Sequence, residues 1–467
     1  MSALATLRVS LTLAVITRLA AQAPDTSLAW KLKNDDTGLV LGIRSCSEIV
    51  QQPDDAGAGE LWHFMPADEG RWKLVNLAVG ALLAIADGSA TGGAVIPAPD
   101  TGAPDRLWIA ADAKNGSIQL RHVNSGLVLS AAAAGAVILA PDDASARQRW
   151  TLIATGPAYP DPAPVSGDIR VHDPSMTRTA AGTYYLFGTH RGVLISSSPD
   201  RVHFTSAGQA FTAPPAWVSA YNPRGDLWAP DVSRHHGRYL LYYTASRFGT
   251  QNSAIGLATS RDASPGSWSD RGVLIASQPG SPYNAIDPAL AVDRSGKWWL
   301  SFGSFWNGIN LIAIDPATGK QLAGDSAVHR LAHRPASPAI EGACIYPHGP
   351  WYYLFASFDR CCRGAASTYH IVVGRAANIT GPYRDRCGVD MQIGGGTILL
   401  SSHGRYAGPG GQSVFHDTGG DYLIYHYYDA AQGGRPTLGI NSIGWDAAGW
   451  PFLCGAAGCP RSGAKVR

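Results

Sequence analysis

Short apolar runs that alternate large and small residues recur through the second half of the chain. They read TYYLFGT (183–189), RYLLYYTAS (238–246), WWLSFGS (298–304), WYYLFASF (351–358) and DYLIYHYYDA (421–430). Such runs predict β-strands in a sheet. An acid precedes each of the first four: Asp173 in VHDP, Asp231 in WAPD, Asp287 in AIDP and Glu341 in IEGA, at spacings of 58, 56 and 54 residues. The fifth run follows the glycine-rich stretch AGPGGQSVF (407–415).

Five units of this size are typical of a β-propeller with five four-stranded blades. The innermost strand of every blade lies beside the central axis. We therefore expect an acid at the same place in successive blades to bring distant carboxylates together at one mouth of the propeller. This explains why Asp173 and Pro174, both poor strand formers, stand at the start of a strand.

A different repeat occupies residues 30–154. WKLKN (30–34) recurs as WKLVN (72–76) and, more weakly, as LRHVN (120–124), and the three copies close on Trp62, Trp108 and Trp150. Units this short cannot bury a core alone, so the three copies must pack together. The stretch GPAYPDPAPVSGD (156–168) is rich in proline and glycine and predicts a linker between two domains.

Composition agrees with an all-β, exported protein. The 467 residues exceed one ordinary core, charged residues are only 15%, and Gly (54), Trp (14) and Tyr (18) are abundant. A net charge of +2 without a basic cluster gives no reason to expect a nucleic acid partner. Residues 1–23 combine Arg8, an apolar run and a small-residue end, which predicts a signal peptide, and no later stretch has the length of a membrane helix. We expect domains at 24–155 and 169–467 and a secreted monomer.

The seven cysteines fit an oxidising compartment only loosely. Cys454 and Cys459 could bridge across a turn, Cys361 and Cys362 could be either thiols or an adjacent disulfide, and the odd count leaves at least one cysteine unpaired. No cysteine or histidine spacing indicates zinc.

Several acids converging in an aromatic, low-charge site favour glycoside hydrolysis. That reaction needs one protonated carboxylic acid for the leaving oxygen and one carboxylate that activates water or attacks directly. A third acid can help to keep the proton on the donor. The alternative is structural, because an Asp before Pro is also a common turn pair.

The motifs VHDPSM, LWAPDVSRHHGRYLLYYTAS, NSAIGLATS, YNAIDPAL, WLSFGSFWNGI, IEGACIY, FDRCCRG and YHYYD together resemble glycoside hydrolase family 43, and within it the endo-1,5-α-L-arabinanases. The resemblance covers residues 168–453 and implies that Asp173 is the general base, Glu341 the general acid, and Asp287 the residue that raises the donor's pKa and orients it. The family inverts configuration, so these two carboxyls should lie about 6.5–9.5 Å apart. Asp231 would be a structural anchor.

The resemblance also implies the surroundings of these acids. Asn284 and Ser304 match positions that contact the sugar, and Trp228, Phe248 and Trp306 are candidate stacking surfaces, although an aromatic side chain in a propeller is more often core. His426 matches a histidine that faces a hydrated cation, often calcium, on the propeller axis; the alternative is a buried structural histidine. Many relatives have GPGHN where this chain has GPGGQS (408–413). No organic cofactor is expected.

The expected partner is plant cell-wall arabinan or arabino-oligosaccharides. Alternatives are an exo-acting α-L-arabinofuranosidase or β-xylosidase on the same propeller, or a two-module lectin without catalysis. Because all the proposed chemistry follows the linker, hydrolysis of soluble arabinan should not depend on residues 24–160.

The first repeat resembles the ricin-B-type β-trefoil, which also serves as a carbohydrate-binding module. Its Gln-x-Trp signature is intact only at residues 148–150, since Glu60 and Arg106 replace the glutamine in the other copies. Sugar-binding trefoils carry an Asp where this chain has Gly42, Ile85 and Ser130. The β-trefoil fold is expected, whereas sugar binding by it stays open, and the tryptophans are predicted to be core.

Overall fold

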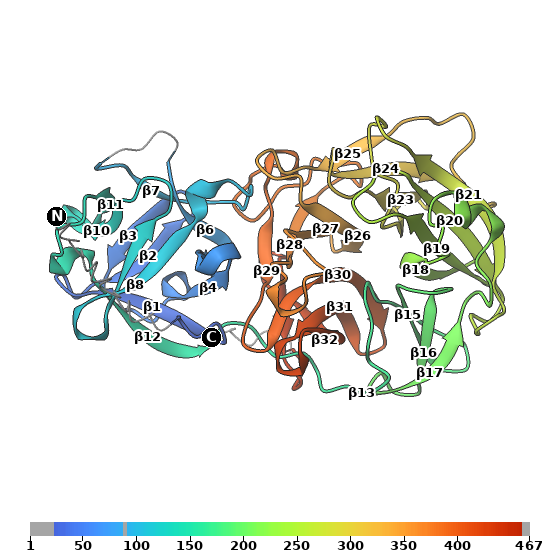
Figure 1. Cartoon of the computed structure of the whole chain (residues 1–467), viewed down its shortest axis with the longest axis horizontal. Helices are drawn as coiled ribbons and strands as arrows, with labels where there is room; N and C mark the ends of the chain where they lie inside the picture. Colours follow the sequence, from blue (N-terminus) through green and yellow to red (C-terminus); the bar gives the residue numbers. More distant parts are fainter. Residues whose placement is uncertain (1–22, 87–90, 460–467) are drawn as a thin grey trace, which may run out of the picture.

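The computed structural model describes residues 23–86 and 91–459. Two all-β domains lie side by side (Figure 1): an N-terminal domain drawn in blue to teal and a larger one drawn in green to red. The predicted signal peptide, apart from Ala23, falls outside the described residues. None of the helices in the described part of the chain is long and apolar enough to cross a membrane.

The N-terminal domain is a β-trefoil, as predicted. Its strands are β1 (Leu28–Asn34), β2 (Val40–Ser45), β3 (Glu48–Gln52), β4 (Trp62–Pro66), β5 (Trp72–Asn76), β6 (Ala81–Ile85), β7 (Val95–Ala98), β8 (Trp108–Asp112), β9 (Ile118–His122), β10 (Val128–Ala131), β11 (Val137–Ala140) and β12 (Trp150–Pro157). Trp62, Trp108 and Trp150 are fully buried. Each donates its indole N–H to the backbone carbonyl of a leucine in its own copy, at 2.9, 2.9 and 3.2 Å. The three tryptophans are therefore core and offer no sugar platform.

The second domain is a five-bladed propeller, which confirms the predicted fold. Its antiparallel blades are β14 (Ser175–Arg178), β15 (Tyr184–Gly188), β16 (Leu194–Ser198) and β17 (His203–Gln209); β18 (Trp228–His235), β19 (Arg238–Ser246), β20 (Ser253–Ser260) and β21 (Ser269–Ser277); β22 (Ala289–Val292), β23 (Trp298–Phe302), β24 (Ile309–Ile314) and β25 (His329–Ala332); β26 (Ile340–His348), β27 (Trp351–Phe358), β28 (His370–Ala376) and β29 (Thr397–Leu400); β30 (Tyr406–Asp417), β31 (Gly420–Asp429), β32 (Arg435–Trp445) and β33 (Pro451–Cys454). The short β13 (Ser166–Gly167) pairs in parallel with β17. First strands of successive blades touch one another, and β30 touches β14, so the ring closes. The apolar runs of the sequence are the second strands, which are buried on both faces.

The two domains share an interface with a core of its own. Met65, Val75 and Leu82 of the trefoil belong to the same buried cluster as Val372 and Ile398 of the fourth blade. Removing residues 24–160 would expose this cluster, so the interface bears on the expectation that hydrolysis does not depend on them. The sequence pattern missed the contact because the apolar residues that make it look like ordinary strand residues of either domain.

The segment that connects the domains is packed against both of them. Tyr159 is buried, with its ring 5.1 Å from the His63 ring of the trefoil and 5.4 Å from the His403 ring of the propeller. His63 also reaches the backbone carbonyl of Ser402 at 3.1 Å. These contacts fix the connection in place.

Three disulfides are present. Cys454–Cys459 closes the predicted turn, and Cys361–Cys362 is an adjacent pair. Cys46–Cys387 joins the trefoil to the propeller across 341 positions of sequence, a pairing that no spacing could indicate. Cys344 is buried and unpaired.

Candidate active site

The inner end of every blade carries one residue with left-handed backbone. These residues are Asp173 (φ 48°), Ala229 (φ 43°), Asp287 (φ 56°), Gly342 (φ 60°) and Gly411 (φ 56°). Glycine enters this conformation freely, and aspartate does so more readily than most residues. Around the axis they and their neighbours line a cavity of about 40 Å³ to which all five blades contribute. In the second, fourth and fifth blades the left-handed residue lies inside the inner strand, where the pairing register with the next strand shifts.

This alignment corrects the predicted register of the four acids. Only Asp173 and Asp287 occupy equivalent positions; Glu341 lies one residue before the left-handed Gly342, and Asp231 lies two residues after Ala229. The nearly equal spacings in the sequence hid these offsets because the loops between blades differ in length. Equal spacing of acids was therefore an incomplete guide to their geometry.

Asp231 links neighbouring blades. Its carboxylate accepts the backbone N–H of Leu290 in β22 at 2.9 Å, in agreement with the structural role predicted for it. Burial raises the pKa of Asp231 to about 7, and the single backbone hydrogen bond opposes that rise only in part.

Asp173 is held as a carboxylate. Its Oδ2 atom accepts hydrogen bonds from His172 Nδ1 at 2.8 Å and from the Thr189 hydroxyl at 2.6 Å. Burial by itself would raise the pKa of Asp173, but the charge and hydrogen bond of His172, the nearby His426 and the Thr189 hydroxyl outweigh burial and lower it. A carboxylate that stays ionised under these conditions can accept a proton from water.

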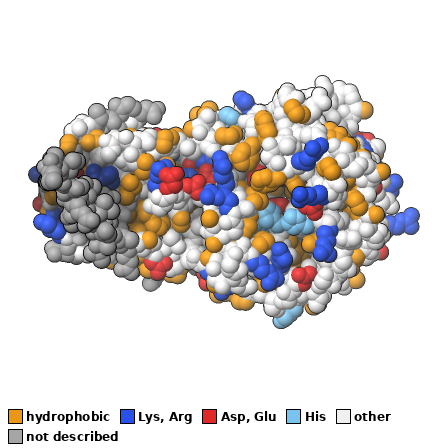
Figure 2. Space-filling view, in the orientation of Figure 1, with side chains coloured by type: hydrophobic (Ala, Val, Ile, Leu, Met, Phe, Trp, Pro, Cys, Tyr) orange, Lys and Arg blue, Asp and Glu red, His pale blue; other side chains and the backbone are white. Residues whose placement is uncertain are grey.

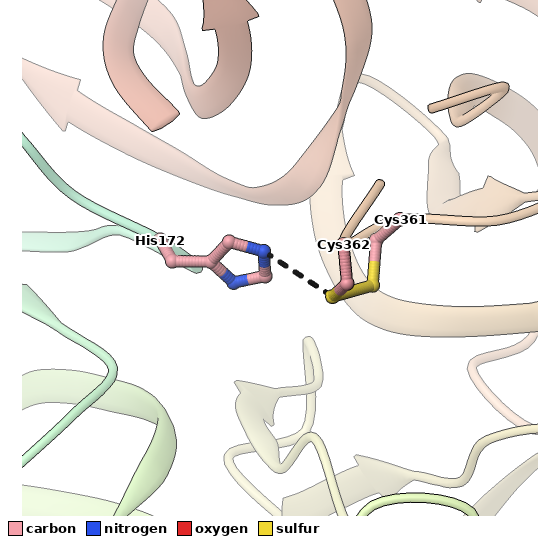
Figure 3. A group of neighbouring side chains, drawn as sticks. All are labelled: His172, Cys361 and Cys362. Atoms are coloured by element: carbon pink, nitrogen blue, oxygen red, sulfur yellow. Dashed lines mark hydrogen bonds between the residues drawn. A yellow bond between two sulfur atoms is a disulfide. The ribbon is translucent and has the colours of Figure 1, made fainter. Parts of the chain in front are cut away.

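A chain of hydrogen bonds orients His172. The adjacent disulfide packs against the ring, with Cys362 Sγ 3.7 Å from His172 Nε2 (Figure 3). The backbone N–H of Cys362 donates to the Tyr428 hydroxyl at 2.7 Å, and that hydroxyl lies 2.7 Å from Nε2 of His172. A carboxylate only accepts, so Nδ1 of His172 donates to Asp173, and the Tyr428 hydroxyl holds the ring at Nε2 on its other side. The disulfide loop thus fixes the ring that holds Asp173.

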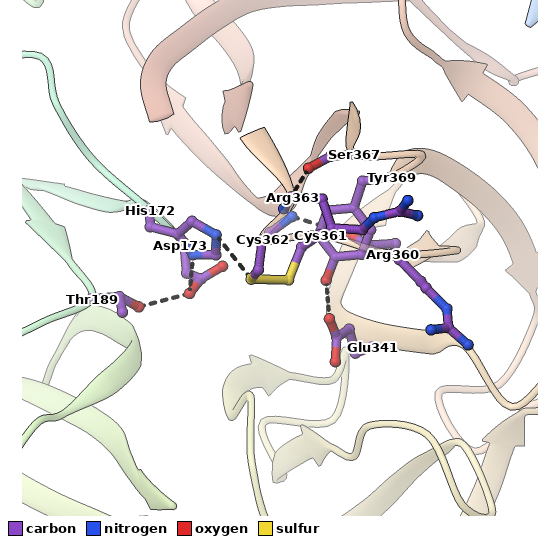
Figure 4. The surroundings of a disulfide bond; sticks show 12 residues. His172, Asp173, Thr189, Glu341, Arg360, Cys361, Cys362, Arg363, Ser367 and Tyr369 are labelled. Atoms are coloured by element: carbon purple, nitrogen blue, oxygen red, sulfur yellow. Dashed lines mark hydrogen bonds and ion pairs between the residues drawn. A yellow bond between two sulfur atoms is a disulfide. The ribbon is translucent and has the colours of Figure 1, made fainter. Parts of the chain in front are cut away.

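Glu341 has the opposite electrostatic character. Its Oε2 atom accepts the Ser304 hydroxyl at 2.6 Å, and its Oε1 atom accepts the Tyr369 hydroxyl. Burial raises the pKa of Glu341, the two hydrogen bonds oppose the rise, and the charge of Asp173 adds to it. The net effect is a raised pKa, which suits a proton donor. Figure 4 shows Tyr369 reaching Glu341 from the same loop that carries the disulfide.

Asp287 is the third acid of the cluster. Its Oδ2 atom accepts the backbone N–H of Gly342 at 3.0 Å. Burial, Glu341 and Asp173 all raise the pKa of Asp287 well above its usual value. Two neighbouring acids with raised pKa values and one ionised partner give the separation of proton affinities that hydrolysis requires.

The residues predicted to contact the sugar differ in their burial. Ser304 and Asn284 are both buried; Ser304 is bonded to Glu341, whereas the Asn284 side chain accepts a hydrogen bond from Ser253 at 2.8 Å. Trp228 is half-buried and donates its indole N–H to Asp226 at 3.1 Å. Phe248 and Trp306 are 78% and 42% exposed, so neither is core and both are free to stack on a sugar. Contact with substrate stays a prediction for all of them.

His426 is fully buried and its ring stacks on His172 with centroids 3.8 Å apart. Its Nδ1 atom accepts the backbone N–H of Asp173 at 3.1 Å, and burial lowers its pKa well below the usual value. The neutral ring therefore carries its proton on Nε2, a buried atom without a partner among the described residues. An N–H cannot ligate a cation directly, but it can donate to a water of a hydrated cation. Gln412, near the position where many relatives carry histidine, is already bonded to Ser357 and to the backbone of Gly342.

Four further residues of the site escaped prediction from the sequence: His172, Thr189, Tyr369 and Tyr428. His172 and Tyr428 stand inside the motifs VHDPSM and YHYYD, so their neighbours gave a signal. Thr189 and Tyr369 lie at strand ends with no distinguishing pattern.

Comparison with known proteins agrees with this geometry. The family model described as Glycosyl hydrolases family 43 matches residues 163–451, and that described as Ricin-type beta-trefoil lectin domain-like matches residues 20–98. A Bacillus subtilis extracellular endo-α-(1→5)-L-arabinanase is 42% identical over 288 residues, which are 60% of this chain and 87% of that protein. A Cellvibrio japonicus extracellular exo-α-(1→5)-L-arabinofuranosidase is 41% identical over 299 residues, covering 61% of this chain and 86% of that protein.

Solved structures give the same result. A family 43 endo-arabinanase from Bacillus licheniformis shares 43% identity with a TM-score of 0.59 and covers 62% of this chain and 99% of its own. A Cellvibrio cellulosa α-L-arabinanase complexed with arabinohexaose shares 39% identity with a TM-score of 0.58 and covers 62% and 96%. The resemblance drawn from the motifs is thereby confirmed, and the chain belongs to glycosyl hydrolase family 43, with a ricin-type β-trefoil domain preceding the propeller.

Proposed function

We propose that the protein is a secreted, endo-acting arabinanase that hydrolyses α-1,5-L-arabinofuranosyl linkages with inversion. The observation that carries this proposal is the contrast between Asp173, whose pKa is lowered, and Glu341, whose pKa is raised, within one cluster at the propeller mouth. The names of the similar proteins supply the substrate class.

In the proposed mechanism, Asp173 takes a proton from a water molecule that attacks the anomeric carbon. Thr189 and His172 both bind Oδ2 of the carboxylate, so Oδ1 would be the atom that takes the proton. Glu341 gives its proton to the leaving oxygen, and Tyr369 and Ser304 fix its direction. This division of roles is that of an inverting glycosidase.

Asp287 would keep the proton on the acid. Because it is buried next to Glu341 and Asp173, a second negative charge in this cluster is costly, so a proton stays in the Asp287–Glu341 pair until the leaving group takes it. Its hydrogen bond to Gly342 also orients the backbone beside Glu341.

We further propose that a calcium ion on the propeller axis would be bound through its water molecules. His426 would donate Nε2–H to one of its waters, because the tautomer set by Asp173 leaves no lone pair for direct binding. A cation there would offset part of the negative charge of the acids. No step of the mechanism depends on it.

Secretion is supported by the signal-like residues 1–23, by the three disulfides and by the extracellular relatives.

The test is a product profile on linear 1,5-arabinan, arabinoxylan and galactan. We expect a ladder of arabino-oligosaccharides from arabinan from the earliest times and no release from the other two polymers. The second candidate is exo action, because one similar protein is a Cellvibrio exo-enzyme. Exo action would instead release one short product from the start. Binding of arabinan without turnover would contradict both and indicate a lectin.

A further inference from the structure

We infer that the middle repeat of the trefoil is part of the catalytic apparatus: through Lys73 it positions the loop Asp359–Tyr369, which holds the general acid. This inference rests on the roles proposed above for Glu341 and Asp173. Lys73 touches no reacting atom, so it is a positioning residue.

One ion pair recurs at matching places in the three copies of the trefoil. Lys31 pairs with Asp54, Lys73 with Asp100 at 2.6 Å, and Arg121 with Asp142 at 2.6 Å. The basic residues stand at matching places in WKLKN, WKLVN and LRHVN, and the acids at matching places before the closing tryptophans. The pair is therefore a repeated feature of the fold, and a copy that departs from it is informative.

In the first copy, the lysine has two acidic partners and both lie within the trefoil. Lys31 also binds Glu60, which is fully buried, at 2.8 Å. The second copy has Arg106 at the place of Glu60. The second acid for Lys73 comes instead from the propeller, as Asp359 at 2.7 Å.

Arg334 of the propeller completes the cluster from the other side. It is fully buried and binds the Asp100 carboxylate at 2.9 Å and the Asp359 carboxylate at 2.8 Å. Its Nε also donates to the backbone carbonyl of Asp100 at 2.9 Å. Two cations and two carboxylates, one of each from either domain, thus neutralise one another in the interface.

This cluster includes residues at both ends of the loop between β27 and β28. Asp359 directly follows β27, and His370, whose Nε2 lies 3.2 Å from Asp100, is the first residue of β28. Near the middle of the loop, Arg363 pairs with Asp68 of the trefoil at 2.8 Å. Figure 2 shows acidic and basic side chains gathered where the two domains meet, on the face that also exposes histidine and acidic side chains near the middle of the propeller.

The same loop contacts Glu341 directly and is connected to Asp173 through two other side chains. Tyr369 donates to Glu341, and Cys362 supports the Tyr428–His172 chain that ends on Asp173. A cavity of about 180 Å³, lined by residues of both domains that include Lys73, Asp359, Arg360 and Thr368, lies beside the cluster. The loop borders open space on this side, where ion pairs hold it to the trefoil.

The experiment compares Lys73→Met with Lys31→Met in the full-length protein. Both lysines are nearly buried and each pairs with two acids, so Lys31→Met controls for the loss of a buried cation; Arg334 still pairs with both acids of Lys73, so Lys73→Met should be no less stable than Lys31→Met. For Lys73→Met we expect kcat on linear arabinan to fall about 10- to 100-fold with KM little changed, as for a small displacement of a catalytic group. The loss on a nitrophenyl α-L-arabinofuranoside, which needs less protonation, should be smaller. Lys73→Arg should recover most of the lost kcat, since the cavity gives room for the guanidinium.

Lys31→Met should keep the kcat of the unaltered enzyme. Equal kcat in the two methionine variants, or equal losses of Lys73→Met on both substrates, would overturn the inference. If Lys73→Met does not fold, Asp68→Asn decides: its partly exposed pair with Arg363 should cost about two- to fivefold in kcat on arabinan, and an unchanged kcat would overturn it. If the unaltered enzyme leaves arabinan intact but cleaves the aryl furanoside, the proposed substrate is wrong. The effect of Lys73→Met on kcat is then still measured with the aryl furanoside.

Discussion

The free energy of unfolding of the Asp231→Asn variant should rise relative to that of the unaltered chain as the pH goes from acid to neutral. Burial raises the pKa of Asp231 to about 7, whereas an unfolded chain has a value near 3.8. The folded state therefore binds more protons between these two values, and the contribution of Asp231 to the free energy of unfolding falls as pH rises through that window. Asparagine removes this loss, because it stays neutral and its carbonyl can still accept the Leu290 N–H.

The size of the effect follows from the shift. Roughly three pKa units correspond to an upper limit of roughly 4 kcal/mol, and with local relaxation around the carboxylate we expect the variant's gain to grow by about 1–3 kcal/mol between about pH 4 and about pH 8. Guanidinium unfolding followed by tryptophan fluorescence at the two pH values measures it.

A matched control comes from the same blade. Asp262 follows β20, and hydrogen bonds from Ser264 lower its pKa, so it is ionised throughout most of this range in both states. Asp262→Asn should change stability by nearly the same amount at both pH values. If Asp231→Asn behaves like this control, or is less stable at the higher pH, the carboxylate is not buried as the structure has it.

Four further results are expected. Glu341→Gln should lower kcat on arabinan by about 10²–10⁴-fold and that on an aryl arabinofuranoside by less; equal losses on both would remove Glu341 from the role of acid. Asp173→Ala should lose nearly all hydrolysis, and added azide should restore some rate with the β-azide as product. Azide in place of a missing nucleophile would give the same β-azide, so proton NMR of the first anomer released by the unaltered enzyme decides the mechanism: the β-anomer indicates inversion and the α-anomer retention. Replacing Cys46 and Cys387 by serine should lower the free energy of unfolding by up to about 6 kcal/mol, from the chain-entropy relation for a loop of 341 residues, and an unchanged unfolding temperature would refute this. Deleting residues 24–160 should give a protein that aggregates or loses most of its activity, because the shared interface core becomes exposed; a soluble propeller with full kcat would show that the sequence expectation was correct after all.

The propeller and the trefoil could be predicted because their signals are local. Each apolar run becomes one buried strand, and each repeat of the trefoil keeps its tryptophan. The placement of the acids could be predicted only in part. Backbone handedness decides it, and Ala229 and Gly342 give no sign in the sequence that they occupy the position of Asp173 and Asp287.

Handedness also shows why the fourth blade differs. There a glycine fills the left-handed position, and the acidic side chain comes from the residue before it. In the fifth blade a Cβ on Gly411 would lie 2.4 Å from the Asp173 carboxylate, so the missing side chain makes room for Asp173. The contact of Tyr369 with Glu341 depends on a loop, and the pairing of Lys73 with Asp359 depends on domain packing; neither leaves a periodic trace.

The Cys46–Cys387 bond turns the stretch between these residues into a closed covalent ring that contains the segment joining the domains. A protease that cuts once anywhere inside this ring, the exposed parts of residues 158–165 included, opens the ring without releasing either domain. The nicked enzyme should migrate as one species under non-reducing conditions and as two fragments after reduction. In a medium rich in proteases the trefoil would thus stay attached to the propeller after its peptide connection is lost.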